Sequence, residues 1–121
     1  MNERLLDRIS LTLPTASPYR GVASLVLGGV GGRLDLAYEQ TDDLQLGILS
    51  ALGAAAGDSV TIEIEIADET VQVSVGPLAD GTADDRALLN VLAKLVDAVD
   101  DTRREGREWL VLSLSRRPER L

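Results

Sequence analysis

The sequence contains no cysteine and no histidine among its 121 residues. These absences exclude disulfide bonds, cysteine nucleophiles and Ser-His-Asp triads, and they remove the usual ligands of zinc sites. A phosphohistidine relay on this chain is excluded for the same reason. Function classes that depend on either side chain are therefore set aside.

Aromatic residues are nearly absent as well: Tyr19, Tyr38 and Trp109 are present, and phenylalanine is missing. The core must therefore be built from leucine, valine, isoleucine and alanine. Proteins that bind single-stranded nucleic acid stack bases on aromatic side chains. The sequence offers few such platforms, which argues against that function.

Long apolar runs are also missing, since no stretch of 18 apolar residues occurs. No basic-then-apolar leader opens the sequence. We therefore expect a soluble protein in the cytoplasm, with no membrane partner.

Basic residues are outnumbered: 12 lysines and arginines face 20 acidic side chains, for a net charge of −8. Nucleic acid is an unlikely main partner, because phosphate binding requires a basic surface. Arg116, Arg117 and Arg120 form a short basic cluster, which we interpret as a solvated tail. With 45% hydrophobic residues, residues 1–121 are long enough for one globular domain. Residues 1–7 are expected to be frayed or disordered, or to form a short lead-in helix.

Alternating and helical periodicities predict seven elements. The pattern predicts strands at 8–13, 60–66, 71–75 and 109–115, and helices at 19–36, 42–56 and 84–99. The remaining stretches are predicted to be connections, including a loop at 76–82 and a charged turn at 100–107. Because each strand has one polar face, the order predicts an α+β fold. We expect a two-layer sandwich, with a mostly antiparallel mixed sheet and the helices on one face.

The helix predicted at 42–56 organises the rest of the chain. Leu44, Ile48 and Leu52 recur every four residues and form an apolar face. Thr41 or Asp42 is expected to cap its first turn, and Gly57 to end it. The small residues on this helix favour close packing against the sheet, although they could instead line a pocket; they are Gly47, Ala51, Ala54 and Ala55.

Two patterns imitate chemical motifs. Gly29 and Gly31 suggest a phosphate loop, but the third glycine that such a loop needs is replaced by Leu34. We interpret the cluster as a weak or kinked helix. Glu63 and Glu65 could be taken for paired catalytic carboxylates, but they lie on the predicted outer face of a strand. A solvated face is the simpler interpretation.

Two long stretches carry a resemblance to a known family. PYRGVASLVLGGVGGRLDLAYEQTDDLQLGILSAL resembles a first long helix followed by an ATP-box helix. ALLNVLAKLVDAVDDTRREGREWLVLSLSRR resembles a last helix and a closing strand. Together with the order of elements, they make the chain similar to the anti-sigma-factor serine kinases of the RsbW type, within the GHKL ATPase superfamily. The resemblance implies a histidine-kinase-ATPase-like, Bergerat-type fold.

The residues that hold nucleotide in that family are not matched here. The family's glutamate base and magnesium-binding asparagine fall on Ser50 and Ala54, which suit neither role. The adenine-reading aspartate falls on Gly76, and Asp80-Gly81 could be a displaced relic of that motif. The glycine turn beneath the phosphates falls on residues 83–87, where Asp84 and Asp85 would repel a triphosphate.

The resemblance therefore implies a degenerate, non-catalytic relative that needs no cofactor or metal and acts by binding another protein in transcription or signalling control. Its partner would be a sigma factor, an anti-anti-sigma-like protein or a second copy in a homodimer. The family uses an arginine near the start of its first long helix for partner contact, and Arg20 is the nearest match. Two alternatives remain open: an active ATP-dependent serine protein kinase, and a structural dimerisation module.

Overall fold

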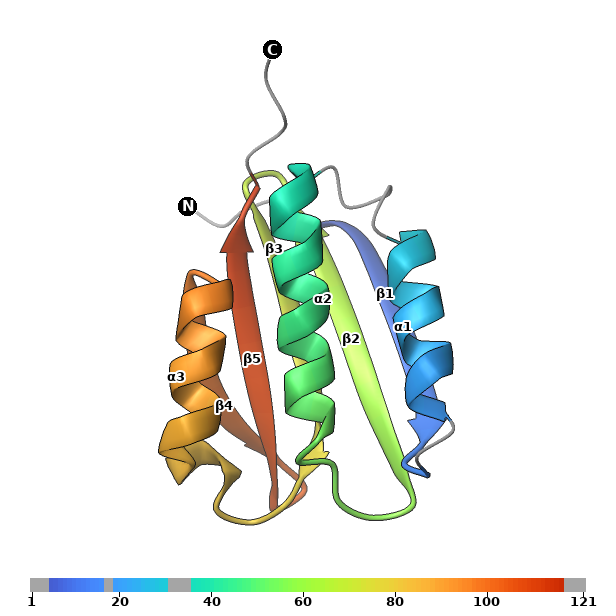
Figure 1. Ribbon diagram of the computed structural model, residues 1–121, viewed down its shortest axis with the longest axis vertical. Helices are drawn as coiled ribbons and strands as arrows, with labels where there is room; N and C mark the ends of the chain where they lie inside the picture. Colours follow the sequence, from blue (N-terminus) through green and yellow to red (C-terminus); the bar gives the residue numbers. More distant parts are fainter. Residues whose placement is uncertain (1–4, 17–18, 31–35, 117–121) are drawn as a thin grey trace.

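The computed structural model describes residues 5–16, 19–30 and 36–116. Its elements follow one another from the N-terminus to the C-terminus as Figure 1 shows. They are β1 (Leu5–Pro14), α1 (Tyr19–Val30), α2 (Tyr38–Leu52), β2 (Ser59–Ala67), β3 (Thr70–Leu78), a 3₁₀ turn (Thr82–Asp84), α3 (Arg86–Leu95), β4 (Ala98–Arg104) and β5 (Arg107–Ser115).

The five strands form one sheet in the order β1-β2-β3-β5-β4. The three helices lie side by side over one face of it, with α2 in the centre (Figure 1). The predicted α+β class and the two-layer arrangement are confirmed. The expected mixed sheet is not found, because every neighbouring pair of described strands is antiparallel. None of the described helices combines the length and the apolarity that crossing a membrane requires.

The hairpin of β2 and β3 forms the centre of the core. The alternating residues predicted to point inward are all buried, at 4% exposure or less; they are Val60, Ile62, Ile64, Ile66, Val71, Val73 and Val75. Leu44, Ile48 and Leu52 of α2 pack onto them, as the helical periodicity predicts. Burying this apolar surface drives the association of helices and sheet.

Helix α2 begins four residues earlier than the sequence predicted. Its N-cap is Ala37 rather than Thr41 or Asp42, and no side chain caps it there. The first turn is held instead by Gln40, whose Oε1 accepts from the Ala37 amide at 3.3 Å. The Gln40 Nε2 also donates to the Ser115 carbonyl at 2.7 Å. This link to β5 is a tertiary contact, which the local pattern did not reveal.

The same helix also ends early, at Leu52. The three alanines that follow run beside the end of β3: Ala79 donates to the Ala54 carbonyl, and Ala56 donates to the Pro77 carbonyl. Pairing with the strand replaces the helical hydrogen bonds, so α2 cannot continue to residue 56. Gly57 has φ +91° and turns the chain toward β2 rather than ending the helix.

Strand β4 replaces most of the turn predicted at 100–107. The sequence Ala98–Arg104 is charged and exposed, so it lacks the alternation by which strands are recognised. It pairs with β5 through a two-residue turn at Glu105 and Gly106, which have φ of 52° and 77°. Charged side chains are common on edge strands, where they discourage pairing between molecules.

Other boundaries also shift. Residues Gly76 to Leu78 belong to β3 rather than to a loop, and α3 ends at Leu95 rather than at residue 99. Helix α1 ends at Val30, and residues 31–35 of the predicted longer helix lie outside the described part. Residues 5–7 belong to β1 rather than to a frayed end.

Candidate functional site

A cavity of about 340 Å³ lies where α2 ends and α3 begins. These segments meet at the lower end of the molecule in Figure 1. Its walls come from the last turn of α2, the loop after β3 and the first turn of α3; they are Ser50, Gly53, Ala54, Ala79, Asp80, Gly81, Thr82, Asp85 and Leu88. The resemblance pointed to three separate stretches of sequence, and residues from all three line this cavity.

The two α2 positions that the resemblance singled out contribute little chemistry to the cavity. The Ser50 hydroxyl donates to the Leu46 carbonyl of its own helix at 2.8 Å. Ala54 presents only a methyl group. Farther up the helix, Gly47 packs closely, since a Cβ there would lie 3.6 Å from Leu112. The small residues therefore divide between close packing, as at Gly47 and buried Ala51, and the cavity wall, as at Ala54.

Gly76, the position on which the family's adenine-reading aspartate falls, is not among the residues that line the cavity. Val75 is buried in the core, so Gly76 faces the side of the sheet away from the helices. A Cβ at Gly76 would collide with the Trp109 indole. Arg104 stacks on that indole at 4.1 Å from its centroid and binds the Glu63 carboxylate at 2.8 Å. An aspartate at position 76 would meet this stack rather than a ligand in the cavity.

Glu108 anchors the loop that borders the cavity. Its Oε2 accepts from the Gly81 amide at 2.6 Å, and its Oε1 accepts from the Ala83 amide at 2.9 Å. The residue is only 6% exposed. The Ala83 and Gly81 amides and the charge of Arg103 together outweigh desolvation and lower the pKa of Glu108 from its usual 4.5. The side chain is therefore an ionised carboxylate at neutral pH.

Asp85 caps α3 in the same part of the molecule. It occupies the N-cap position, and its Oδ1 accepts from the Leu88 amide at 3.1 Å. A capping carboxylate satisfies an unpaired amide and complements the positive end of the helix dipole. Buried Thr82 donates its hydroxyl to the Ala79 carbonyl and tightens the preceding turn.

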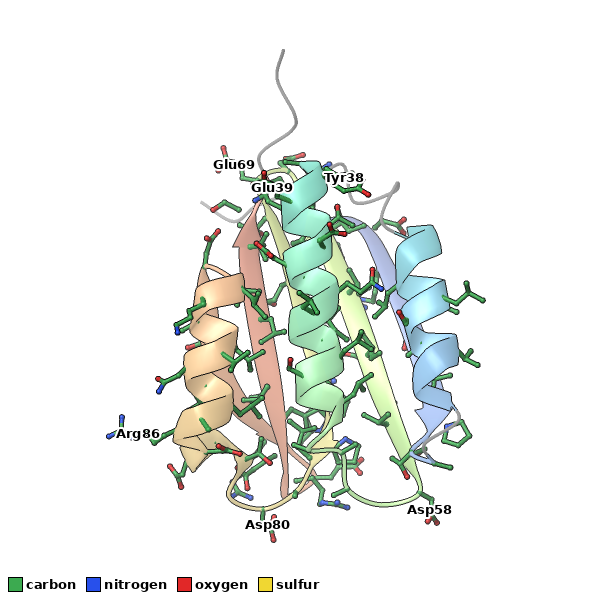
Figure 2. All side chains as sticks on the ribbon, in the orientation of Figure 1. Tyr38, Glu39, Asp58, Glu69, Asp80 and Arg86 are labelled. Carbon is green, nitrogen blue, oxygen red and sulfur yellow. The ribbon has the colours of Figure 1, made fainter. Side chains whose placement is uncertain are left out.

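Among the described residues, no basic side chain lines the cavity. Arg86, which follows Asp85 in the sequence, extends outward from α3, and Asp80 projects from the lower edge of the loop (Figure 2). Among the described residues, no three acidic side chains lie together in a way that would hold a metal ion. The charged side chains that line the described cavity, Asp80 and Asp85, are therefore both acidic.

The remaining predicted residues lie elsewhere. Glu63 and Glu65 are on the outer face of β2, as predicted, but each is paired, with Arg104 and Arg8 respectively. Both ion pairs are partly exposed, so they contribute little to stability. Arg20 lies in the first turn of α1, away from the cavity, and its side chain is outside the described part of the structure.

Glu108 is not among the residues predicted from the sequence, although the pattern of β5 contains a clue to its position. Leu110, Leu112 and Leu114 alternate on the buried face of β5, and continuing that alternation backward places residue 108 on the same face. A glutamate at an inward position requires partners. The loop amides that supply them are 25 and 27 residues away in sequence, so local reasoning did not connect them.

No protein-family model matches this sequence, and no curated protein matches it either.

Proposed function

We propose that this protein is a non-catalytic regulator that acts by binding another protein, as the resemblance to RsbW-type anti-sigma factors implies. The observation that carries the proposal is the chemistry of the cavity between α2 and α3. Residues from the three stretches that the resemblance compares with a nucleotide site line this cavity, and they include Ser50 and Ala54 at the family's two chemical positions and Asp80 and Asp85 as the charged side chains. A sigma factor or an anti-anti-sigma-like protein fits the resemblance as partner.

Phosphoryl transfer makes demands that these residues do not meet. It needs a magnesium ion between the phosphates and positioned cations around the transferred group. The Ala54 methyl cannot coordinate a metal, and the Ser50 hydroxyl is engaged by its own helix. The charged side chains that line the cavity, Asp80 and Asp85, are both acidic and would repel the phosphates.

Backbone amides could in principle substitute for cations, since loop amides and helix N-termini bind phosphate. Here the amides of Gly81 and Ala83 donate to Glu108, and the first turn of α3 is capped by Asp85. Internal carboxylates thus occupy the amides of Gly81, Ala83 and Leu88, which an incoming anion could otherwise use. This arrangement supports a protein-binding function over nucleotide chemistry.

Calorimetric titration with ATP and ADP in the presence of magnesium tests the absence of nucleotide binding. We expect no heat of binding and no thermal stabilisation at millimolar nucleotide, because nothing in the cavity compensates the phosphate charge. Binding tighter than about 100 μM, equivalent to about −5.5 kcal/mol, would contradict the proposal. Magnesium-dependent transfer of phosphate to a protein serine would support the active-kinase alternative.

The protein-binding half of the proposal needs its own experiment. A tagged chain, cross-linked in its native cells and purified, should retain a specific protein that also binds the purified chain in a direct assay. Failure to recover any partner that passes the direct assay would remove this half of the proposal, whatever the outcome with nucleotide.

A second candidate function, a module that dimerises, is favoured by helix α1. Val22 and Leu25 are 44% and 79% exposed on a helix whose residues from 21 to 30 include no charge. Beside it, β1 is an edge strand with no neighbour on its outer side among the described strands. Pairing of β1 with β1 of a second copy about a two-fold axis would join the two sheets and bring both α1 helices together.

Light scattering with Leu25→Glu tests this second function. If the dimer forms through α1 and β1, the wild-type chain should have twice the monomer mass at micromolar concentration, and the variant should be monomeric with an unchanged circular dichroism spectrum. The matched control is Leu46→Glu, which alters another exposed leucine, on α2, and should remain dimeric. A monomeric wild-type chain, or equal dissociation of both variants, would exclude this interface.

A further inference from the structure

The electrostatics of the cavity between α2 and α3 are one-sided. Asp80 and Asp85 border it, and both are exposed to solvent. The last turn of α2 contributes Ser50, so the negative end of that helix dipole also lies at the wall. These features attract a positive charge and none of the lining side chains opposes it.

The backbone amides near the cavity that carry partial positive charge already donate hydrogen bonds to carboxylates of this chain. The amides of Gly81 and Ala83 donate to Glu108, a carboxylate of this chain, and the start of α3 is capped by Asp85. An anionic ligand that used the Gly81, Ala83 or Leu88 amide would have to displace one of these internal carboxylates. A cation would displace nothing, and it would meet carboxylates that still have free lone pairs, since a carboxylate accepts several hydrogen bonds.

The size and the wall chemistry define the ligand further. A volume of about 340 Å³ is at the lower end of the range for small-ligand sites, about 300–1,000 Å³. Ala54 and Leu88 offer apolar surface beside the acidic rim. An aliphatic stem that ends in a charged head matches this combination, because long basic side chains pack their stems on apolar surface and leave the head on polar groups.

We propose that the cavity receives a basic side chain, an arginine, from the protein partner. The guanidinium group would lie at the rim against Asp80 and Asp85, with its stem along Leu88. Arginine is favoured over lysine because its planar group binds carboxylates at two points and loses less hydration at an interface. This inference rests on the proposed protein-binding function and specifies the chemistry of the partner. The net charge of −8 favours such a basic partner at longer range.

The probe for this inference is the peptide acetyl-Gly-Gly-Arg-Gly-Gly-amide, titrated into isotopically labelled protein and followed by NMR. We expect saturable shifts of the Gly53, Ala54 and Gly81 amides, which surround the cavity. The matched peptide with citrulline in place of arginine keeps the shape but loses the charge, and it should cause no such shifts. Salt at 0.5 M should weaken the arginine effect, because the rim is exposed to solvent.

Charge-removing variants test which residues bind the probe. Asp85→Asn retains an oxygen that can cap α3, so the double variant Asp80→Asn/Asp85→Asn is expected to fold, which its amide spectrum verifies. We expect its dissociation constant for the arginine peptide to rise about threefold to tenfold. The control variant Glu39→Gln removes one charge at the opposite end of the molecule (Figure 2) and should leave the constant unchanged.

The possible failures are distinguishable. Equal shifts with the citrulline peptide, shifts scattered over the acidic surface, or an unchanged constant in the double variant would overturn the inference. A partner protein that binds the wild-type chain and the double variant equally well would also overturn it, while the proposed protein-binding function would stand. Binding of magnesium-ATP in the cavity would instead overturn the proposed function itself.

Discussion

Replacing Gly76 with valine is expected to lower the free energy of unfolding by roughly 3 kcal/mol or more. Valine is normally a favourable residue in a strand, so local propensity predicts the opposite result. The cost comes from the Trp109 indole, which occupies the space that a Cβ at position 76 requires. The indole would have to move, and its contact with Arg104 would be lost. Urea denaturation followed by circular dichroism measures the effect.

A double-mutant cycle separates this clash from a general cost of valine at position 76. In the background of Trp109→Ala, the indole is gone, and Gly76→Val should cost much less than it does in the wild-type chain. A matched control is Ser74→Val, which introduces the same side chain two residues away on the same strand and the same face. Equal costs of Gly76→Val in both backgrounds would show that Trp109 does not impose the glycine.

The sequence predicts best those strands that have one side in the apolar core and the other side in a polar environment. Strand β2 alternates strictly because one side faces the core and the other is polar. Every residue of β2 and β3 predicted to be inward is buried, although Ser74 on the other face of β3 is buried too. The α+β layering follows from such patterns. Strand β4 was missed for the converse reason: its sequence Ala98–Arg104 is largely exposed, and it is a strand because β5 lies beside it.

The sequence pointed to several residues that line the cavity, but it did not predict the hydrogen bonds and packing contacts around them. Comparison with a family pattern named Ser50, Ala54, Asp80 and Asp85, and the structure brings these residues to one cavity. The same comparison placed the family's missing adenine-reading aspartate at Gly76, which faces the other side of the sheet. Moving one position along a strand reverses the face on which a side chain lies, so the face given to this position depends on the exact register of the match.

Glu108 and Trp109 make contacts with residues that are distant in sequence, and local sequence patterns cannot predict such contacts. They are consecutive residues on opposite faces of β5, and each contacts a different part of the segment 76–83. Glu108 satisfies the loop amides on the helix side, and Trp109 covers Gly76 on the other side. Both contacts join residues about 25–35 positions apart in sequence, so they emerge only from the pairing of β3 with β5. The loop amides on the helix side and the space beside Gly76 on the other side are therefore both occupied by residues of β5.

Replacing Glu108 with glutamine should release the loop at 79–84 and change how stability depends on pH. The amides of Gly81 and Ala83 lose a charged acceptor, and glutamine offers only one oxygen for the two donors. We expect these two amides to exchange hydrogen about tenfold or more faster than in the wild-type chain, because amides bonded to a carboxylate are held more strongly than those bonded to neutral groups. Hydrogen exchange followed by NMR measures each amide separately.

The pH dependence gives this prediction a second, independent readout. The pKa of Glu108 in the folded chain is lowered from its usual 4.5, so the carboxylate stabilises the fold fully above about pH 4.5. This stabilisation is lost as the pH falls through the lowered pKa that Glu108 has in the folded chain, because the carboxylate is then protonated in the folded chain as well as in the unfolded chain. Wild type should therefore exceed Glu108→Gln in stability most at neutral pH, with the difference shrinking in acid. As a control, Asp101→Asn removes an exposed charge from adjacent β4 and should leave the exchange rates of the Gly81 and Ala83 amides unchanged. A constant difference between wild type and Glu108→Gln from pH 7 to pH 3 would show that shape, rather than the charge on the loop amides, accounts for the role of Glu108.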